Sequence, residues 1–387
     1  MSAIRPQFSS PAPVIFGRGA IGVLGEKAKA LGCKKVMCIY DEGIEAAGIA
    51  QKAIKSLEDA GVAYVTYSGV ISDPPDHTVD EAGRIAVEAG ADCLVGIGGG
   101  SSMDTAKAAA IYLLDPGPVR RYILQTPQYI NTKTPVILIP TTAGTGSECT
   151  TVAIISLPDL NVKWSAFVNT ALAIVDPELT VTLPQYETVN TGLDAFAHAA
   201  EAMTGINWNY HSDLFGEAAI RKICQNLCVC WSEPGNLDAR SELALAANWA
   251  GLAFNDPVTH VGHAVGDALG CHYHTPHGLS CALALPEALS LVAPVVPERM
   301  RVIAAAMGLK LTGGESGAAL GKLVADGIRA MMRSMGMKSL KELGCARGEV
   351  IGFAPEIVAN HLSEYCPVEI TEAVASKLLA DVYDSYQ

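Results

Sequence analysis

The stretch that decides the fold runs from Asp92 to Leu113 and reads DCLVGIGGGSSMDTAKAAAIYL. Its first part, Asp92–Ile97, is a short apolar run that is typical of a buried strand. The run enters the turn Gly98-Gly-Gly-Ser101, after which Ser102–Leu113 has the length and alanine-rich composition of a helix. A strand, a glycine-rich turn and a helix in this order predict one unit of an α/β fold.

The same alternation continues on both sides of this unit. Further strands are predicted at Val14–Gly17, Lys35–Tyr40, Val62–Tyr67 and Pro135–Ile139, and further helices at Ala20–Leu31, Gly43–Ala60 and Thr78–Ala89. Gly32 and Gly61 directly follow two of these helices and are suited to end them. Strands that alternate with helices of this length predict a mostly parallel sheet with helices on both faces.

The pattern changes after about Thr188, where strand-like runs give way to alanine-rich helical periodicity. Helical segments are predicted at residues 191–204, 211–230, 238–255, 259–270, 280–292, 296–308, 315–335, 347–361 and 369–385. We interpret Asp176–Pro184 as the hinge between the two patterns. The sequence therefore predicts an α/β domain over residues 1–185 and an all-helical domain over residues 186–387.

Charge and hydropathy limit the partners of the chain. Its formal net charge is −13, and no run of lysine and arginine is present, so nucleic acids and anionic membrane surfaces are unfavourable partners. No uncharged apolar run reaches about 18 residues, the length that a membrane-spanning helix requires. The first residues contain no apolar core of a secretory signal. The eleven cysteines are scattered and odd in number, which indicates free thiols in a reducing cytoplasm.

Two glycine-rich turns predict a nucleotide site. In the first, Gly98–Ser101, the backbone N–H groups and the start of the following helix form an anion-binding site. The second, Thr141–Ser147, reads TTAGTGS and adds hydroxyl groups where a nucleotide can lie close to the backbone. Both turns follow strands, so they can line one crevice at the carboxyl ends of a parallel sheet. Tight packing between strand and helix is the alternative reason for glycine at such turns.

Asp41 follows the buried strand Lys35–Tyr40. A carboxylate at this point can accept hydrogen bonds from a ribose 2′-hydroxyl and repels a 2′-phosphate, which favours NAD over NADP. The alternative is that Asp41 caps the next helix, a common use of aspartate.

Histidines cluster in the stretch HVGHAVGDALGCHYHTPHG, residues 260–278, which holds five of the nine histidines of the chain. Neutral imidazole is the commonest side-chain ligand of transition metals. Earlier, Asp194 and His198 lie four residues apart, so a helix presents both on one face. With His263 and His277, the latter expected on the loop after a helix, they make a set of three nitrogens and one oxygen that suits a divalent first-row metal. The alternative is that these histidines pack in the protein interior or cap helices and bind no metal.

Several motifs together resemble the iron-containing (group III) alcohol dehydrogenases, in the order of that family and over about residues 10–385. These motifs are GGGSSMDTAK at 98–107, PTTAGTGSE at 140–148, DPEL at 176–179, GLDAFAH at 192–198, HAVGDALG at 263–270 and PHG at 276–278. The resemblance implies the dehydroquinate-synthase-like architecture, with a Rossmann-like NAD-binding domain, a helical metal domain and a cleft between them.

Matched position by position, the resemblance implies a set of site residues. The metal ligands would be Asp194, His198, His263 and His277; the pyrophosphate contacts Gly98, Gly99, Gly100 and Ser101; and further cofactor contacts Thr141, Thr142, Thr145, Ser147, Asp41 and Lys163. His277 and Lys163 would also belong to the catalytic set. The metal would be Fe²⁺, and Zn²⁺ accepts the same donors.

One position departs from the family. Many members carry a second histidine one turn after the third ligand, where it is thought to relay the substrate proton, and this chain has Asp267 there. An aspartate can also pass a proton, so Asp267 joins the catalytic candidates, and His274 and water are further candidates for the relay.

The activity expected from these residues is the interconversion of a small primary alcohol and its aldehyde, with NAD(H) as the hydride carrier and the metal polarising the substrate oxygen. A functionalised aldehyde of the lactaldehyde, semialdehyde or sulfoacetaldehyde type is an alternative substrate. A lyase of the same architecture and a protein that only binds metal or nucleotide are alternative functions. We also expect a homo-oligomer, a dimer or larger.

Overall fold

The computed structural model describes residues 8–123, 129–160 and 162–387. It divides the chain into two compact units. One comprises Ser10–Leu183, and the other comprises Pro184–Gln387 together with the described residues before Ser10.

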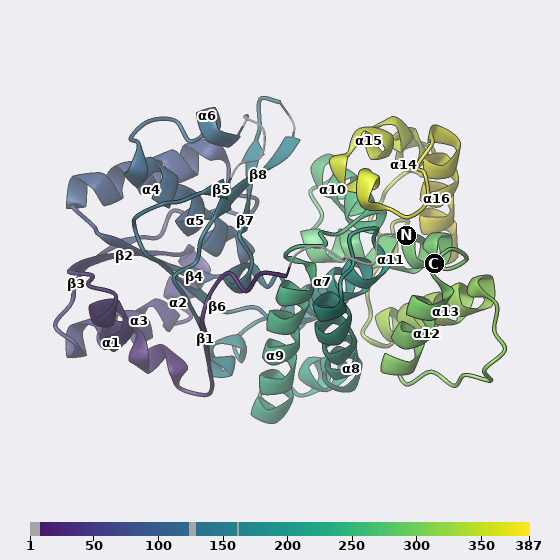
Figure 1. Cartoon of the computed structure of the whole chain (residues 1–387), viewed down its shortest axis with the longest axis horizontal. Helices are drawn as coiled ribbons and strands as arrows, with labels where there is room; N and C mark the ends of the chain where they lie inside the picture. The colour runs from purple at the N-terminus through teal and green to yellow at the C-terminus, as the bar shows by residue number, and fades with distance from the viewer. Residues whose placement is uncertain (1–7, 124–128, 161) are drawn as a thin grey trace. The chain divides into compact units, whose positions relative to one another are not determined.

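The first unit is built on a parallel sheet (Figure 1). Within the described residues this sheet has six strands in the order β1-β9-β6-β4-β2-β3. The strands are β1 (Val14–Phe16), β2 (Lys35–Ile39), β3 (Ala63–Tyr67), β4 (Cys93–Gly98), β6 (Val136–Pro140) and β9 (Leu172–Val175). After β2 the chain first moves outward to β3 and then returns to β4 on the other side of β2. The carboxyl ends of β2 and β4 therefore form the switch point at which open α/β sheets bind ligands.

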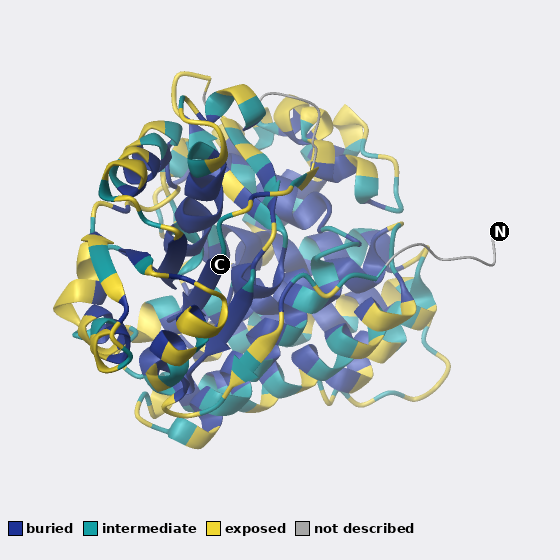
Figure 2. Ribbon diagram, turned by 60° about the vertical axis from the view of Figure 1, so that its left-hand side comes forward, coloured by how far each residue is buried: buried dark blue, intermediate teal, exposed yellow. Residues whose placement is uncertain are grey.

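Helices cover both faces of this sheet because its strands are buried on both sides. Met37 and Ile39 of β2 pack in one core with α4 (Asp76–Ala89) and α5 (Gly100–Leu114). Val36 and Cys38 point to the opposite core with α1 (Leu24–Ala30) and α3 (Ile49–Asp59). The central strands β4 and β6 are buried throughout (Figure 2), which explains their continuous apolar runs.

The structure differs from the sequence-based expectation at several points in this unit, and strand β9 of the main sheet was not expected. The expected helix Gly43–Ala60 is two helices, α2 (Glu42–Ala46) and α3, because Gly48 has a left-handed φ of 71° that interrupts the helix. A hairpin of β7 (Val152–Leu157) and β8 (Val162–Val168) forms a small sheet with β5 (Tyr129–Ile130), and none of these strands was expected.

The second unit is helical in its described residues, as expected. Its helices are α7 (Gln185–Thr204), α8 (Tyr210–Ser232), α9 (Leu237–Phe254), α10 (Val261–Tyr273), α11 (His277–Val292), α12 (Pro297–Ala306), α13 (Gly317–Ser334), α14 (Arg347–Gly352), α15 (Ala354–Ala359) and α16 (Glu372–Ser385). The central helix α7 is buried over almost its whole length and packs against α8, α9 and α11. In the part of the chain that the structure describes, no helix is long and apolar enough to cross a membrane.

Candidate active site

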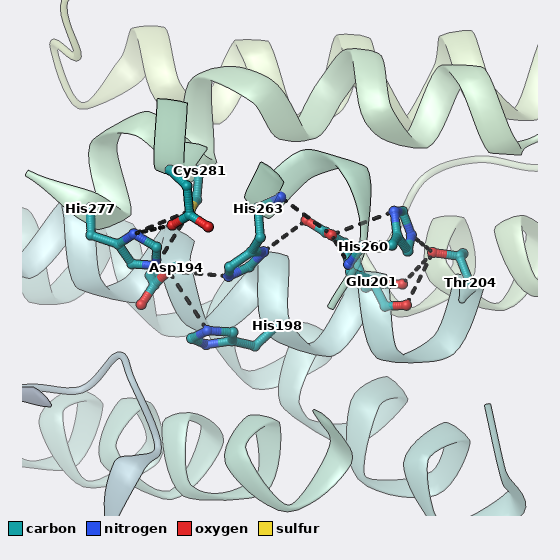
Figure 3. A network of polar contacts seen from close by, with 10 residues as sticks. Asp194, His198, Glu201, Thr204, His260, His263, His277 and Cys281 are labelled. Carbon is teal, nitrogen blue, oxygen red and sulfur yellow. Dashed lines mark hydrogen bonds and ion pairs between the residues drawn. The ribbon is translucent and has the colours of Figure 1, made fainter. Parts of the chain in front are cut away.

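Three helices of the second unit bring one carboxylate and three imidazoles together (Figure 3). Asp194 and His198 lie one turn apart on α7, and His263 lies on α10. His277 is the first residue of α11 rather than a loop residue. The three imidazole Nε2 atoms surround Asp194 Oδ1, at 3.9 Å for His198, 3.9 Å for His263 and 3.8 Å for His277.

This arrangement fits a divalent metal ion. Bonds of about 2.1 Å from a central metal in tetrahedral geometry would set donor atoms about 3.4 Å apart, close to the spacing found here. Asp194 Oδ1 and His263 Nε2 are buried and have no hydrogen-bond partner among the described residues. Burial of His198 lowers its pKa to about 4 despite the nearby Asp194, which keeps the imidazole in the neutral form that binds metals. The donor chemistry, the burial and the unsatisfied atoms therefore agree with the expected metal.

Glu201, which the sequence analysis overlooked, lies behind this cluster and is completely buried. Its Oε1 accepts a hydrogen bond from His263 Nδ1 at 2.9 Å, and its Oε2 accepts one from the backbone N–H of His260 at 2.6 Å. Burial alone would raise the pKa of Glu201, but His263 and His260 outweigh this effect and lower that pKa to about 2. With its Nδ1 held in this way, His263 directs Nε2 toward Asp194.

The contact between Glu201 and α10 needs a glycine. A Cβ on Gly262 would lie 2.3 Å from Glu201 Oε1, so a larger residue would displace the carboxylate. The helical spacing from His198 to Glu201 offered a local signal for this residue. Its partner is on α10, far away in sequence, so only tertiary structure pairs them.

Cys281 is a second residue that the sequence analysis overlooked. It lies one turn after His277 on α11, and its Sγ is 3.6 Å from His277 Nε2. Ligand atoms of Asp194, His263, His277 and Cys281 all lie within 4.8 Å of one another. Burial raises the pKa of the Cys281 thiol to about 12.

Asp267 lies on α10 one turn after His263, as expected. Its Oδ1 is 3.9 Å from His277 Nδ1, and its Oδ2 accepts a hydrogen bond of 3.4 Å from Asn360 Nδ2. His274 ends α10 in a left-handed conformation with φ of 53° and is exposed. Asp267 is therefore the relay candidate beside a metal-site histidine.

The two glycine-rich turns of the first unit lie side by side. Strands β4 and β6 pair up to Gly98, and the Thr141 N–H donates to the Gly98 carbonyl at 2.9 Å. A Cβ on Gly100 would lie 3.0 Å from Thr145 Cγ2, so the turns approach closely only with glycine there. Gly99 caps α5, and Ser101 lies in the first turn of that helix. Thr142 adjoins Gly99, since a Cβ on that glycine would lie 3.4 Å from Thr142 Cγ2.

A buried ion pair fixes the second turn against α5. Lys107 is completely buried, and its Nζ donates to the Ser147 carbonyl at 2.6 Å and to Ser147 Oγ at 2.8 Å. Ser147 Oγ donates to Asp104 Oδ1 at 2.6 Å. Burial lowers the pKa of Lys107 to about 8, although Asp104 partly opposes this shift. The motif residues Asp104 and Lys107, both on α5, thus hold the second turn in place through their contacts with Ser147.

Asp41 lies beside the first turn and also caps a helix. Its Oδ1 accepts from the Ile44 N–H at 3.0 Å at the start of α2, so the capping alternative is confirmed. Its Oδ2 lies 3.5 Å from Ser102 Oγ, and a Cβ on Gly98 would be 3.6 Å away from the same oxygen. Capping of α2 through Oδ1 is compatible with the expected contact to the cofactor ribose, because Oδ2 remains on the side of the first turn.

Lys163 extends from β8, in the hairpin that the sequence analysis did not expect. Its Nζ forms an ion pair with Asp73 Oδ1 at 2.7 Å. Asp73 lies in the loop before α4 and has a positive φ of 50°. The structure therefore shows an ion-pair role for Lys163, and its role toward a cofactor stays a prediction.

Comparisons with known proteins agree with this geometry. Residues 11–177 match the family described as iron-containing alcohol dehydrogenase, and residues 188–383 match the C-terminal part of the Fe-containing alcohol dehydrogenase family. Long-chain-alcohol dehydrogenase 1 of Geobacillus thermodenitrificans is 35% identical over 295 residues, which cover 76% of this chain and 75% of that protein. NAD-dependent methanol dehydrogenase of Bacillus methanolicus is 33% identical over 319 residues, with coverages of 81% and 82%.

A solved structure is similar over nearly the whole chain. The crystal structure of sulfoacetaldehyde reductase from Bifidobacterium kashiwanohense in complex with NAD⁺ has a TM-score of 0.89 and 27% identity, and the match covers 99% of this chain and 100% of that one. Because both family descriptions match and the relatives exceed 30% identity over most of the chain, this protein belongs to the iron-containing alcohol dehydrogenase family.

Proposed function

We propose that this protein interconverts a small primary alcohol and its aldehyde, using NAD(H) and one divalent metal ion. The observation that carries the proposal is the convergence of three imidazole Nε2 atoms on the buried Asp194 Oδ1. When bound, the metal supplies Lewis-acid polarisation of a substrate oxygen, and NAD(H) supplies or accepts the hydride.

The protein's own residues hold the metal ion, position the cofactor and move the substrate proton. Asp194, His198, His263 and His277 hold the metal, and Glu201 fixes the orientation of His263. Gly98–Ser101 hold the cofactor pyrophosphate. The residues Thr141, Thr142, Thr145 and Ser147 of the neighbouring turn make further cofactor contacts, and Lys163 lies along the cofactor. Asp41 accepts from the ribose 2′-hydroxyl through the oxygen that faces the first turn.

Asp267 passes the proton between substrate oxygen and solvent. Its position next to His277 Nδ1, at 3.9 Å, supports this role because it places a carboxylate beside a histidine of the metal site. The hydrogen bond from Asn360 supports it further, since it holds the carboxylate in one orientation.

The relatives are named as enzymes for a long-chain alcohol, methanol and sulfoacetaldehyde, which are substrates that differ widely in size and charge. A functionalised short aldehyde therefore remains the second candidate substrate for this chain.

The test is NADH oxidation with a panel of simple and functionalised short aldehydes, after loading the metal-free protein with Fe²⁺ or Zn²⁺ under anaerobic conditions. We expect metal-dependent turnover of at least one aldehyde and the reverse reaction with its alcohol. Stoichiometric binding of metal and NADH without turnover of any aldehyde or alcohol would contradict the proposal.

We also propose a cytoplasmic, homo-oligomeric protein. All eleven cysteines are free, which supports a reducing compartment. Val14 and Phe16 are exposed on the edge strand β1, which supports association through that edge. Light scattering coupled to size exclusion, comparing wild type with Phe16→Lys, tests the oligomer; a monomeric wild type would contradict it.

A further inference from the structure

We propose that Cys281 supplies a thiolate as a fifth donor to the metal ion. This inference rests on the proposed function, because it concerns the same metal. It adds a ligand to the expected set of Asp194, His198, His263 and His277.

Helical spacing places Cys281 beside His277. His277 and Cys281 lie four residues apart on α11, so both side chains project from one face. Cys281 Sγ lies 3.6 Å from His277 Nε2. In a five-coordinate site, where neighbouring donors subtend angles of about 90–120°, Zn–S bonds of about 2.3 Å and Zn–N bonds of about 2.1 Å set sulfur and nitrogen about 3.1–3.8 Å apart. The separation found lies within this range.

Cys281 also lies close to buried donor atoms that have no hydrogen-bond partner in the described residues. Its Sγ lies within 4.8 Å of the ligand atoms of Asp194 and His263. Both Asp194 Oδ1 and His263 Nε2 are buried without a hydrogen-bond partner in the described parts of the chain. The thiol therefore belongs to the same small group of donors, as Figure 3 shows.

Packing against α10 confines the Cys281 sulfur. A Cβ on Gly266 of α10 would lie 2.6 Å from Cys281 Sγ and 3.2 Å from its backbone nitrogen. Helix α10 thus covers one side of the thiol, and Gly266 leaves the space in which the sulfur lies. Cys281 itself is completely buried, so its sulfur is enclosed beside the other donors.

The coordination step is balanced without an oxidant or reductant. The Cys281 S–H bond breaks, a sulfur–metal bond forms, and the proton leaves to solvent. Two anionic donors, Asp194 and Cys281, then balance the charge of a divalent ion held by three neutral imidazoles. Thiolate is a soft ligand that binds zinc and iron in proteins, and five-coordinate zinc occurs in catalytic sites.

The deciding experiment uses Co²⁺ as a spectroscopic substitute for zinc in the full-length protein. Cobalt bound by thiolate has an intense near-ultraviolet charge-transfer band, whereas cobalt bound by nitrogen and oxygen alone has only weak visible bands. We expect the wild type to develop this band with one equivalent of Co²⁺, and Cys281→Ser to lose it while keeping visible bands.

Matched variants assign the band. Cys345→Ser removes another buried cysteine of the same unit and should keep the band. His263→Ala should lose it, which excludes cobalt bound elsewhere.

Each outcome decides one claim. Visible cobalt bands without a charge-transfer band in the wild type would overturn the role of Cys281 and leave the proposed function intact. Failure to bind any Co²⁺, Zn²⁺ or Fe²⁺ would instead refute the metal dependence of the proposed function. If Cys281→Ser does not fold, Cys281→Ala and the wild-type spectrum still decide the question.

Discussion

Glu201 Oε1 accepts a hydrogen bond from His263 Nδ1 at 2.9 Å, and this contact orients an imidazole that the metal site needs. The same carboxylate accepts from the His260 N–H at the start of α10. One buried residue on α7 thus sets both the position of α10 and the tautomer of its histidine, with Nδ1 protonated and Nε2 available to a metal.

Replacing Glu201 with Gln should weaken metal binding by roughly 10–100-fold. Glutamine offers a single acceptor oxygen, so it cannot serve both His263 and the His260 N–H. NADH binding should be unchanged because the glycine-rich turns belong to the other unit. Chelator competition on the folded protein measures the affinity. Thr204→Val is the control, because Thr204 Oγ1 contacts His260 Nε2 at 2.9 Å but no expected ligand. Equal metal loss in both variants would show that Glu201 supports the packing of this region and does not orient His263 specifically.

His263→Ala should abolish metal retention and turnover and preserve NADH binding. The mutation removes one of the imidazoles that surround Asp194 Oδ1 and leaves the other donors. Metal content by elemental analysis and NADH affinity by fluorescence titration are the measurements. A variant that keeps one metal per chain and normal activity would show that the ligand assignment is wrong.

Replacing Asp41 with Ser should raise the use of NADPH relative to NADH by about tenfold or more, since it removes the charge that repels a 2′-phosphate. Serine retains an oxygen able to cap α2, so the helix start should persist. The ratio of kcat/KM for the two cofactors is the measurement. An unchanged ratio would leave Asp41 with its capping role alone.

Asp267→Asn should lower kcat by roughly 10²–10⁴-fold at full metal content and alter the pH profile, because the amide cannot carry the proton. Asparagine keeps the shape and an oxygen that can accept from Asn360. If activity instead returns on adding Fe²⁺ or Zn²⁺, Asp267 supports His277 in binding metal rather than relaying protons. Full activity with full metal content would exclude both roles.

The metal-free protein should lose stability on acidification, in part through His198. Its folded-state pKa is about 4, against an ordinary value of 6.5. The depressed pKa means that this contribution is complete above pH 6.5 and is lost as the pH falls toward 4, because the unfolded state binds the proton first. Between pH 7 and 5 the loss from this residue is on the order of 2 kcal/mol. Urea unfolding of wild type and His198→Gln should show the variant's smaller pH dependence; parallel curves would contradict the assignment.

The sequence by itself determined the features that local spacing governs. The apolar run of β4, followed by Gly98–Gly100 and a helix, defined the α/β unit because buried parallel strands and tight turns have strong local patterns. Asp194 and His198 were recognised together for the same reason, since four residues in a helix bring two side chains to one face.

Only the tertiary structure decided the contacts between distant segments. The strands β7 and β8 escaped prediction, although Val152–Ile155 is a short apolar run, because several of their side chains are exposed. Glu201 and Cys281 are an ordinary acid and an ordinary thiol in the sequence. They reach the site because α7, α10 and α11 pack together and bury Glu201 beside His263 and Cys281 beside His277.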